Sequence, residues 1–218
     1  MNLDARYDRR RLLGAAALGL AALQFGAGGA RAQDAQALVA KALGDPGPLP
    51  EQGFGPEDAK VRVVEYASLT CHHCRNFHLE TWPLVKAKYV DTGRIRFVIR
   101  EFPLDPLAMG GFMLARCRPD EQWYATVDLL YRSSEVWAHA ADPAAELARV
   151  MGQTGMGAEA FEACLSDQAL MDKIQAVSLS GSVAGVSGTP TFFFNERKES
   201  GFMTIEAFSA ILDPMLEG

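Results

Sequence analysis

Apolar positions along the chain predict three strands and suggest a fourth. Residues 61–67 are rich in β-branched side chains, which favour strands. Residues 95–100 alternate larger apolar side chains with mostly charged ones, and residues 191–194 form a short, largely aromatic run. A polar turn over residues 195–198 separates this run from a weaker strand candidate at residues 199–202. The chain is therefore expected to contain a small sheet.

Helical spacing fills much of the remaining chain. Residues 33–43 predict a short helix, which the proline- and glycine-rich residues 45–50 end. A second helix follows the first strand, with Thr70 as its expected N-cap. Pro83 lies in its middle and is expected to kink it, because proline has no N–H to donate. Residues 91–93 should end this helix before the next strand begins.

The region between residues 105 and 178 shows no strong strand pattern and predicts a helical insertion. A longer helix near residues 167–184 is expected to return the chain to the sheet, and Thr204 should cap a final helix. The shorter helices are expected at residues 110–116, 121–131, 143–151 and 158–165. The plan is thus strand–helix–strand, helical insert, strand–strand–helix. A single helix between the first two strands predicts that they run parallel.

Composition agrees with one folded domain carrying a subdomain. The chain has 218 residues, of which 49% are hydrophobic and 22% charged, so it can bury a sizeable core. It contains no internal repeat or low-complexity tract, and disorder is not expected.

The first 32 residues predict a signal peptide. A basic start at residues 8–11 precedes an uncharged run at residues 12–25, and Ala30-Arg31-Ala32 fits a small-x-small cleavage site. As a helix this run spans about 21 Å, short of the roughly 30 Å membrane core. Cleavage is therefore expected, with no stable membrane insertion of the mature chain. The adjacent arginines before two leucines fit a twin-arginine signal, and an ordinary secretory leader fits equally well.

The net charge of the mature chain limits the classes of partner that it is expected to bind. After cleavage the chain keeps 16 basic and 25 acidic residues, a net charge of −9. This balance argues against nucleic acid or an anionic membrane surface as the main partner.

Export would place the four cysteines in an oxidising compartment, where an even number is expected to pair. Four cysteines allow three connectivities. Cys71 and Cys74, two residues apart, are the natural first pair, which leaves Cys117 with Cys164. That second bond would close a long loop, contributing about 4 kcal/mol in the chain-entropy model, and it is interpreted as structural.

The segment from Cys71 to His78 holds three of the four histidines and half of the cysteines. This cluster can either hold a metal or make and break a disulfide. Redox chemistry needs a thiolate, because only the ionised sulfur attacks or leaves efficiently. Cys71, near a helix N-terminus, would face unpaired N–H groups and a partial positive charge. His73, between the cysteines, can add a hydrogen bond or a full charge.

The chain resembles the thioredoxin superfamily, and within it the disulfide-bond-forming protein A (DsbA) family. Four features carry the resemblance: a C-x-x-C motif between a strand and its helix, a helical block between the two halves, Thr189-Pro190 before a late apolar strand, and an export signal. It covers roughly residue 55 to the C-terminus. It implies a thioredoxin fold, of the α/β class, with an inserted helical subdomain.

Distinct roles follow for the two cysteines. Cys71, nearer to solvent, is expected to be the sulfur that a client thiolate attacks, and Cys74, one turn deeper, the resolving thiol. His73 is expected to tune Cys71. His72 stands where many relatives carry proline, and this departure bears on redox poise rather than on reaction class.

The resemblance also assigns roles to residues that the local pattern leaves open. Only about 5–6% of X–Pro bonds are cis, so sequence alone predicts a trans bond before Pro190. The resemblance implies a cis bond, with Thr189 offering backbone hydrogen bonds to the client. Glu65 is either a solvent-facing strand residue or, as the resemblance implies, a buried acid that relays a proton for Cys74.

The preferred hypothesis is a periplasmic thiol–disulfide oxidoreductase that donates its Cys71–Cys74 disulfide to newly exported, reduced or unfolded proteins. The resemblance implies a quinone-linked membrane oxidase as its reoxidant, and no bound organic cofactor is expected because the cysteines carry the electrons. The expected divisions are 1–32 signal peptide, 33–54 helix and arm, 55–104 and 178–218 thioredoxin domain, and 105–177 helical insertion.

Two alternatives remain open. The chain can be an isomerase or reductase whose cysteines are kept reduced. It can also be a metal-binding or metal-resistance module that uses Cys71, Cys74 and one of His72, His73 or His78. The preferred hypothesis assigns no metal.

Overall fold

The computed structural model describes residues 36–45 and 47–218. The predicted signal peptide at residues 1–32 lies outside this described part of the chain. Within that part, no helix is both long enough and apolar enough to cross a membrane.

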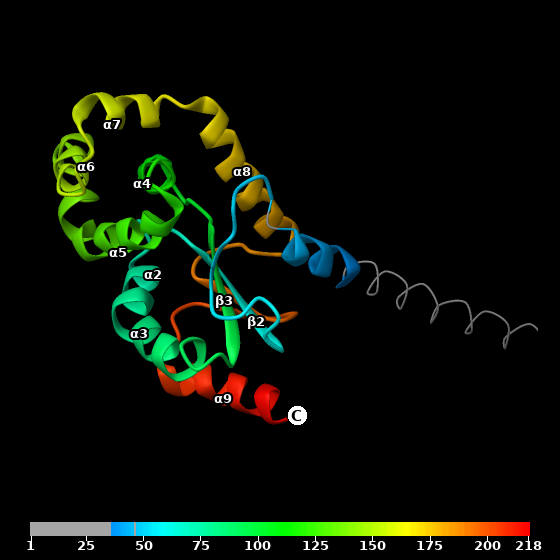
Figure 1. Ribbon diagram of the computed structural model, residues 1–218. Coiled ribbons are helices and arrows are strands. Elements are labelled where there is room, and N and C mark those ends of the chain that lie inside the picture. Colours follow the sequence, from blue (N-terminus) through cyan, green and yellow to red (C-terminus); the bar gives the residue numbers. More distant parts are fainter. Residues whose placement is uncertain (1–35, 46) are drawn as a thin grey trace, which may run out of the picture.

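A five-stranded sheet forms the centre of the molecule (Figure 1), with the strand order β1-β3-β2-β4-β5. The strands are β1 (Gln52–Phe54), β2 (Val61–Ala67), β3 (Ile95–Glu101), β4 (Thr191–Phe194) and β5 (Arg197–Ser200). Strands β2 and β3 run parallel, as predicted, and the other neighbouring pairs run antiparallel. Strand β2 is therefore the central strand, with every residue buried except the half-buried Arg62.

The connection from β2 to β3 is one continuous helical stretch with changes in winding. It consists of α2 (His72–Asn76), the π-helical η1 (Phe77–Thr81), α3 (Trp82–Val85) and the π-helical η2 (Lys86–Val90). Pro83 is among the first residues of α3, directly after the first π-helical segment. The irregularity predicted at this proline thus takes the form of wider turns, which often mark functional sites.

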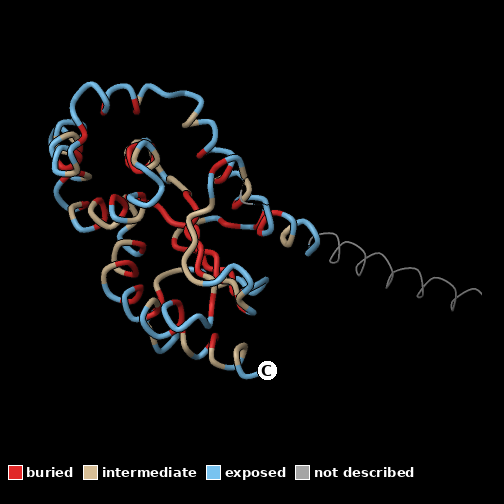
Figure 2. Tube along the Cα trace, in the orientation of Figure 1, coloured by how far each residue is buried: buried red, intermediate tan, exposed pale blue. Residues whose placement is uncertain are grey.

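The two faces of the sheet are covered by different helices. The stretch from α2 to η2 and the last helix, α9 (Ile205–Glu217), pack on the face that contains Val63 and Phe97. Residues 36–44 are helical, and Ala42 and Leu43 pack on the opposite face with Val64. Figure 2 shows the buried residues concentrated in the central strands and on the inward sides of the surrounding helices.

Two close contacts hold the second face together. A Cβ atom at Gly181 would lie 2.6 Å from the ring of Tyr66, so only glycine lets α8 (Gln168–Val183) approach the sheet this closely. The buried guanidinium of Arg100 donates to the backbone oxygens of Ala42 and Leu43 at 3.0 and 2.7 Å. This arginine therefore ties the N-terminal helix to strand β3.

The helical insertion lies beside the sheet, with its first helix inside an arc formed by the helices that follow (Figure 1). It contains α4 (Pro106–Arg116), α5 (Asp120–Trp137), α6 (Pro143–Gly152) and α7 (Ala158–Leu165), and α8 (Gln168–Val183) returns the chain to the sheet. A disulfide joins Cys117, at the end of α4, to Cys164 in α7, with the two Cα atoms 6.2 Å apart. The sequence predicts this pairing because Cys71 and Cys74 form the other natural pair. The disulfide lies within the insertion.

Three predictions about local structure were wrong. Residues 33–54 are not only a helix and arm, because they include strand β1, which at three residues is too short to show a periodicity. Thr70 does not cap α2: Cys71 is the N-cap, and the Thr70 hydroxyl donates to Asp105 instead. Strand β5 covers Arg197–Ser200 rather than 199–202, because the turn needs only Asn195, with its positive φ, and Glu196.

Candidate active site

Cys71 lies at the point where β2 gives way to the active-site helix. It is the N-cap residue of α2, with extended backbone angles, and it is half-buried. Its sulfur lies 3.2 Å from the backbone oxygen of Thr189. Cys71 and Cys74 are both free thiols, so the structure represents the reduced state of the pair.

The pKa of Cys71 is lowered from 9.0 to about 5. The largest cause is the Cys74 thiol, which donates a hydrogen bond to the Cys71 sulfur, and partial burial opposes it. Backbone N–H groups of Cys74 and His73 add to the lowering, as the start of a helix allows. Cys71 is therefore ionised at neutral pH and able to act as a nucleophile.

Cys74 has the opposite environment. It is fully buried, and burial, the hydrogen bond with Cys71 and the nearby Glu65 carboxylate all raise its pKa well above the ordinary value. The two sulfurs thus differ strongly in reactivity, with an accessible thiolate and an inner thiol that keeps its proton.

The loop before β4 brings Thr189 and Pro190 to the active-site sulfur. The Thr189–Pro190 peptide bond is cis, and Pro190 is buried while Thr189 is half-buried. Residues 118 positions apart in the sequence therefore meet through the Cys71 thiol and the Thr189 carbonyl.

The two histidines between the cysteines point to solvent. His72 and His73 are both exposed, and the Nε2 atom of His72 lies 3.1 Å from the Asn76 amide nitrogen. His72 Nδ1 is also 3.9 Å from a Glu135 carboxylate oxygen on α5. His73 contributes to Cys71 through its backbone N–H.

Glu65 is fully buried in β2, so the solvent-facing alternative for this residue is wrong. Its Oε2 atom lies 2.9 Å from His78 Nε2, and both side chains are inaccessible to solvent. The His78 ring stacks on Tyr131 of α5, with ring centroids 4.6 Å apart and planes 19° from parallel. Cys74 is also buried, and the Glu65 carboxylate is close enough to raise its pKa. Glu65, His78 and Cys74 therefore lie in one buried region next to Cys71.

Comparison with known proteins identifies the family. The family model described as Thioredoxin matches residues 50–214. The crystal structure of alpha-DsbA1 from Wolbachia pipientis is 31% identical, with a TM-score of 0.69, and the match covers 78% of this chain and 93% of that one. This chain is a DsbA-like member of the thioredoxin family. The predicted thioredoxin fold with a helical insertion is confirmed.

Other DsbA-like relatives agree. A provisionally named protein-disulfide oxidoreductase of Rickettsia bellii is 32% identical over 167 residues, which cover 75% of this chain and 64% of the relative. The chain spans less than two thirds of the length of such curated relatives, 64% and 60% for the first two. The Chlamydia trachomatis DsbA structure, 16% identical with a TM-score of 0.65, shares the fold, and the match covers 76% of this chain and 91% of that one.

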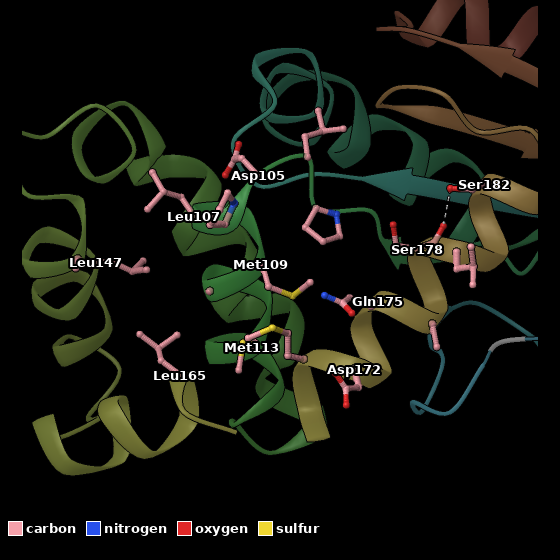
Figure 3. A pocket seen from close by; sticks show the side chains of 18 residues that line it. Asp105, Leu107, Met109, Met113, Leu147, Leu165, Asp172, Gln175, Ser178 and Ser182 are labelled. Atoms are coloured by element: carbon pink, nitrogen blue, oxygen red, sulfur yellow. Dashed lines mark hydrogen bonds between the residues drawn. The ribbon is translucent and has the colours of Figure 1, made fainter. Parts of the chain in front are cut away.

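A large apolar cavity in this DsbA-like chain lies away from the cysteines. It has a volume of about 990 Å³ and lies between the insertion and α8 (Figure 3). Leu107, Met109 and Met113 of α4 line it, opposite Gln175 of α8. None of the predicted site residues lines this cavity, so Cys71 is reached from the surface and not through it.

The residues weighed as metal ligands are not gathered around one point. Among residues 36–45 and 47–218, no group of three His, Cys, Asp or Glu side chains is placed to hold a metal ion. His78, the third histidine of the cluster, bonds to Glu65 instead.

Sequence reasoning missed the role of two residues in the DsbA-like site. The sequence analysis considers His78 only as a possible metal ligand and Tyr131 only as part of a helix. The spacing of His78, four residues after Cys74, places both on one helix face and was an available signal. No sequence signal indicated that Tyr131 would stack on His78, because that contact depends on how the insertion packs.

Proposed function

We propose that this chain is an exported thiol–disulfide oxidoreductase that forms disulfide bonds in client proteins. The observation that carries the proposal is the contrast between the two sulfurs. Cys71 is half-exposed with a pKa of about 5, and Cys74 is fully buried with a raised pKa. A stabilised thiolate favours the reduced form of the enzyme, and this makes its disulfide a stronger oxidant.

In the proposed cycle, a client thiolate attacks the Cys71 sulfur of the Cys71–Cys74 disulfide. The bond between the two cysteines breaks, a mixed disulfide forms at Cys71, and Cys74 leaves as a thiolate that takes up a proton. A second client thiolate then attacks the client sulfur of the mixed disulfide. This releases an oxidised client and leaves Cys71 as a thiolate, so two electrons pass from the client to the enzyme.

The neighbouring residues have supporting roles in this proposal. Thr189 and Pro190 lie beside Cys71, where the backbone of an extended client would bind. Glu65 is proposed to exchange the proton of Cys74, since its carboxylate already acts on the pKa of that thiol. The exposed His72 and His73 flank the approach to the sulfur.

Completion of the cycle requires an oxidant for the reduced pair. We place the enzyme in the periplasm, with reduced or unfolded exported proteins as clients and a quinone-linked membrane oxidase as reoxidant. The two sulfurs carry the electrons, so the reaction needs no bound organic cofactor.

The deciding experiment is the equilibrium of the Cys71–Cys74 couple with glutathione, combined with refolding of ribonuclease. An oxidase should have a potential at the strongly oxidising end of the family range and should refold the reduced ribonuclease. A potential near that of thioredoxin, or faster recovery of scrambled than of reduced ribonuclease, would instead assign the chain as a reductase or an isomerase.

A further inference from the structure

The buried pair of Glu65 and His78 shares one hydrogen bond and leaves one polar atom of each side chain without a partner among the residues that the structure describes. Glu65 Oε2 and His78 Nε2 share one bond of 2.9 Å. The other polar atom of each side chain, Glu65 Oε1 and His78 Nδ1, is buried and finds no hydrogen-bond partner within residues 36–45 and 47–218. Buried polar atoms are normally bonded, so an unpartnered carboxylate oxygen beneath a redox cysteine calls for a function.

The bonded atoms fix how the pair is arranged. To take up a proton, Glu65 must be a carboxylate, which only accepts hydrogen bonds; His78 Nε2 is then the donor to Oε2. A donor on one oxygen stabilises the ionised carboxylate, and this leaves Oε1 free to accept a proton. The His78 ring is held in place by Tyr131 on one side, as the 4.6 Å stacking distance shows.

The surrounding groups leave Cys74 as the proton donor. The titratable side chains that face the pair are Cys71 and Cys74 from the active-site helix and Tyr124 and Tyr131 from α5. Burial raises the pKa of both tyrosines, so they stay neutral. Cys71 is ionised at neutral pH. Only the Cys74 thiol has a proton to give up during the reaction.

We propose that His78 is a positioning residue for the proton transfer at Cys74: its Nε2–H orients the Glu65 carboxylate, with Oε1 free to take the Cys74 proton. This inference rests on the proposed function. When a mixed disulfide at Cys71 is resolved, the Cys74 proton moves to Glu65. The Cys74 thiolate then attacks the Cys71 sulfur, the Cys71–Cys74 bond forms, and the partner leaves as a thiolate. The reverse sequence returns the proton to Cys74.

The test follows the reaction of the reduced, mature protein with oxidised glutathione between pH 5 and 9. Acid-quenched samples, analysed by mass, separate the first step, glutathionylation of Cys71, from the second, its resolution by Cys74. The variants are Glu65→Gln, His78→Phe, His78→Gln and the double variant Glu65→Gln/His78→Phe. Phenylalanine keeps a ring to stack on Tyr131, and glutamine keeps an amide N–H near the position of Nε2.

The expected result is a selective slowing of the second step. His78→Phe should reduce the resolution rate at pH 7 by about tenfold or more, which is less than the roughly 10²-fold or larger effect of losing a proton-transfer group itself because His78 acts through Glu65, and should move the midpoint of the rate to higher pH. His78→Gln should recover part of the rate. In the Glu65→Gln background, His78→Phe should have little further effect, because both residues act through one carboxylate. Glutathionylation of Cys71 should be unchanged throughout.

Three results would overturn the inference. They are an unchanged resolution profile in His78→Phe, equal rates for His78→Gln and His78→Phe, and independent, multiplying effects of Glu65→Gln and His78→Phe. Each would leave His78 as a packing residue whose loss only lowers stability. Failure of the proposed function looks different, because the wild-type protein would then reach an equilibrium with glutathione near that of thioredoxin, whatever the resolution rates of the variants.

Discussion

Cys71 owes its ionisation to its neighbours, and chiefly to one hydrogen bond. The Cys74 thiol is the largest cause of the lowered pKa, ahead of the backbone N–H groups of the helix start. A helix N-terminus alone would lower the pKa of any cysteine at the N-cap position. The larger effect of the Cys74 thiol is specific to this pair of cysteines.

Alkylation of Cys71 tests this order of causes. In reduced wild-type protein the rate should reach half its maximum near pH 5, following the thiolate fraction. Cys74→Ala removes the donor and should move the midpoint to higher pH. Cys74→Ser keeps a hydroxyl donor, so its alkylation midpoint should lie at lower pH than that of Cys74→Ala. Equal midpoints for the two variants would show that backbone groups, not the inner side chain, ionise Cys71.

The same lowered pKa sets a pH dependence of stability for the reduced protein. The ionised Cys71 stabilises the folded state fully above the ordinary pKa of 9.0, and this contribution is lost as the pH falls through about 5. The stability advantage of reduced wild-type protein over Cys71→Ser should therefore increase between pH 5 and pH 9, as measured by urea unfolding under reducing conditions. An advantage that does not change with pH would contradict the lowered pKa.

At this scale, sequence reasoning predicted the residues of the proposed redox pair but not the residues that contact them. Cys71 and Cys74 are recognisable because their spacing and the preceding strand are local features. The contact of Thr189 with Cys71, and that of Tyr131 with His78, join residues more than 50 positions apart. Such contacts are set by the packing of separate elements, and the resemblance to a family supplied the first but not the second.

Individual elements also show where local signals are overridden. Asp105 is the N-cap of helix α4, and its side chain accepts from the Ala108 N–H at 2.8 Å and also from the Thr70 hydroxyl. Thr70 was predicted as a cap for α2, and it is an ordinary capping residue by type. Its hydroxyl is used instead by a carboxylate 35 positions away, and this is why the local prediction failed.

Asp105→Ala should lower the free energy of unfolding by about 1–2 kcal/mol, because it removes both the helix cap and the partner of Thr70. The matched control is Asp142→Ala, which removes the corresponding cap of α6 at an exposed position. Asp142→Ala should lower the free energy of unfolding by less, about 0.5–1 kcal/mol. Urea unfolding of both variants checks the order, and a larger loss for Asp142→Ala would contradict this account.

Two adjacent glycines in α4 should respond oppositely to alanine. A Cβ atom at Gly110 would lie 3.4 Å from Leu165, an ordinary contact, so Gly110→Ala should stabilise the protein by about 0.5–1 kcal/mol. A Cβ atom at Gly111 would approach the buried Leu69 to 2.8 Å, so Gly111→Ala should destabilise it by about 1–3 kcal/mol. Thermal unfolding of the two variants gives the comparison, and a stabilising Gly111→Ala would refute the predicted clash.

On the scale of the whole molecule, the order of elements was predictable, and the way they join was less so. Apolar runs and helical spacing gave β2, β3, β4 and the helical insertion, because those segments are long or strongly patterned. Strand β1 and the docking of residues 36–44 on the sheet depend on long-range partners such as Arg100. Periodicity carries no information about such partners.

The Cys117–Cys164 disulfide should stabilise the whole molecule without taking part in the chemistry. It links cysteines 47 positions apart, so Cys117→Ala/Cys164→Ala should lose about 4 kcal/mol of unfolding free energy in the chain-entropy model. The alkylation midpoint of Cys71 should stay near pH 5 in this variant. A shifted midpoint would indicate that the insertion, through this bond, also controls the active site.

The two edge strands of the sheet bear on how the protein would behave beside extended client chains. Strand β5 lies at one margin with Arg197, Lys198 and Glu199 along its four residues, and β1 at the other has only three residues. Charged or very short outer strands are poor templates for further pairing. If its clients are unfolded polypeptides, as proposed, a protein with this sheet should resist pairing with them edge to edge and should not nucleate their aggregation.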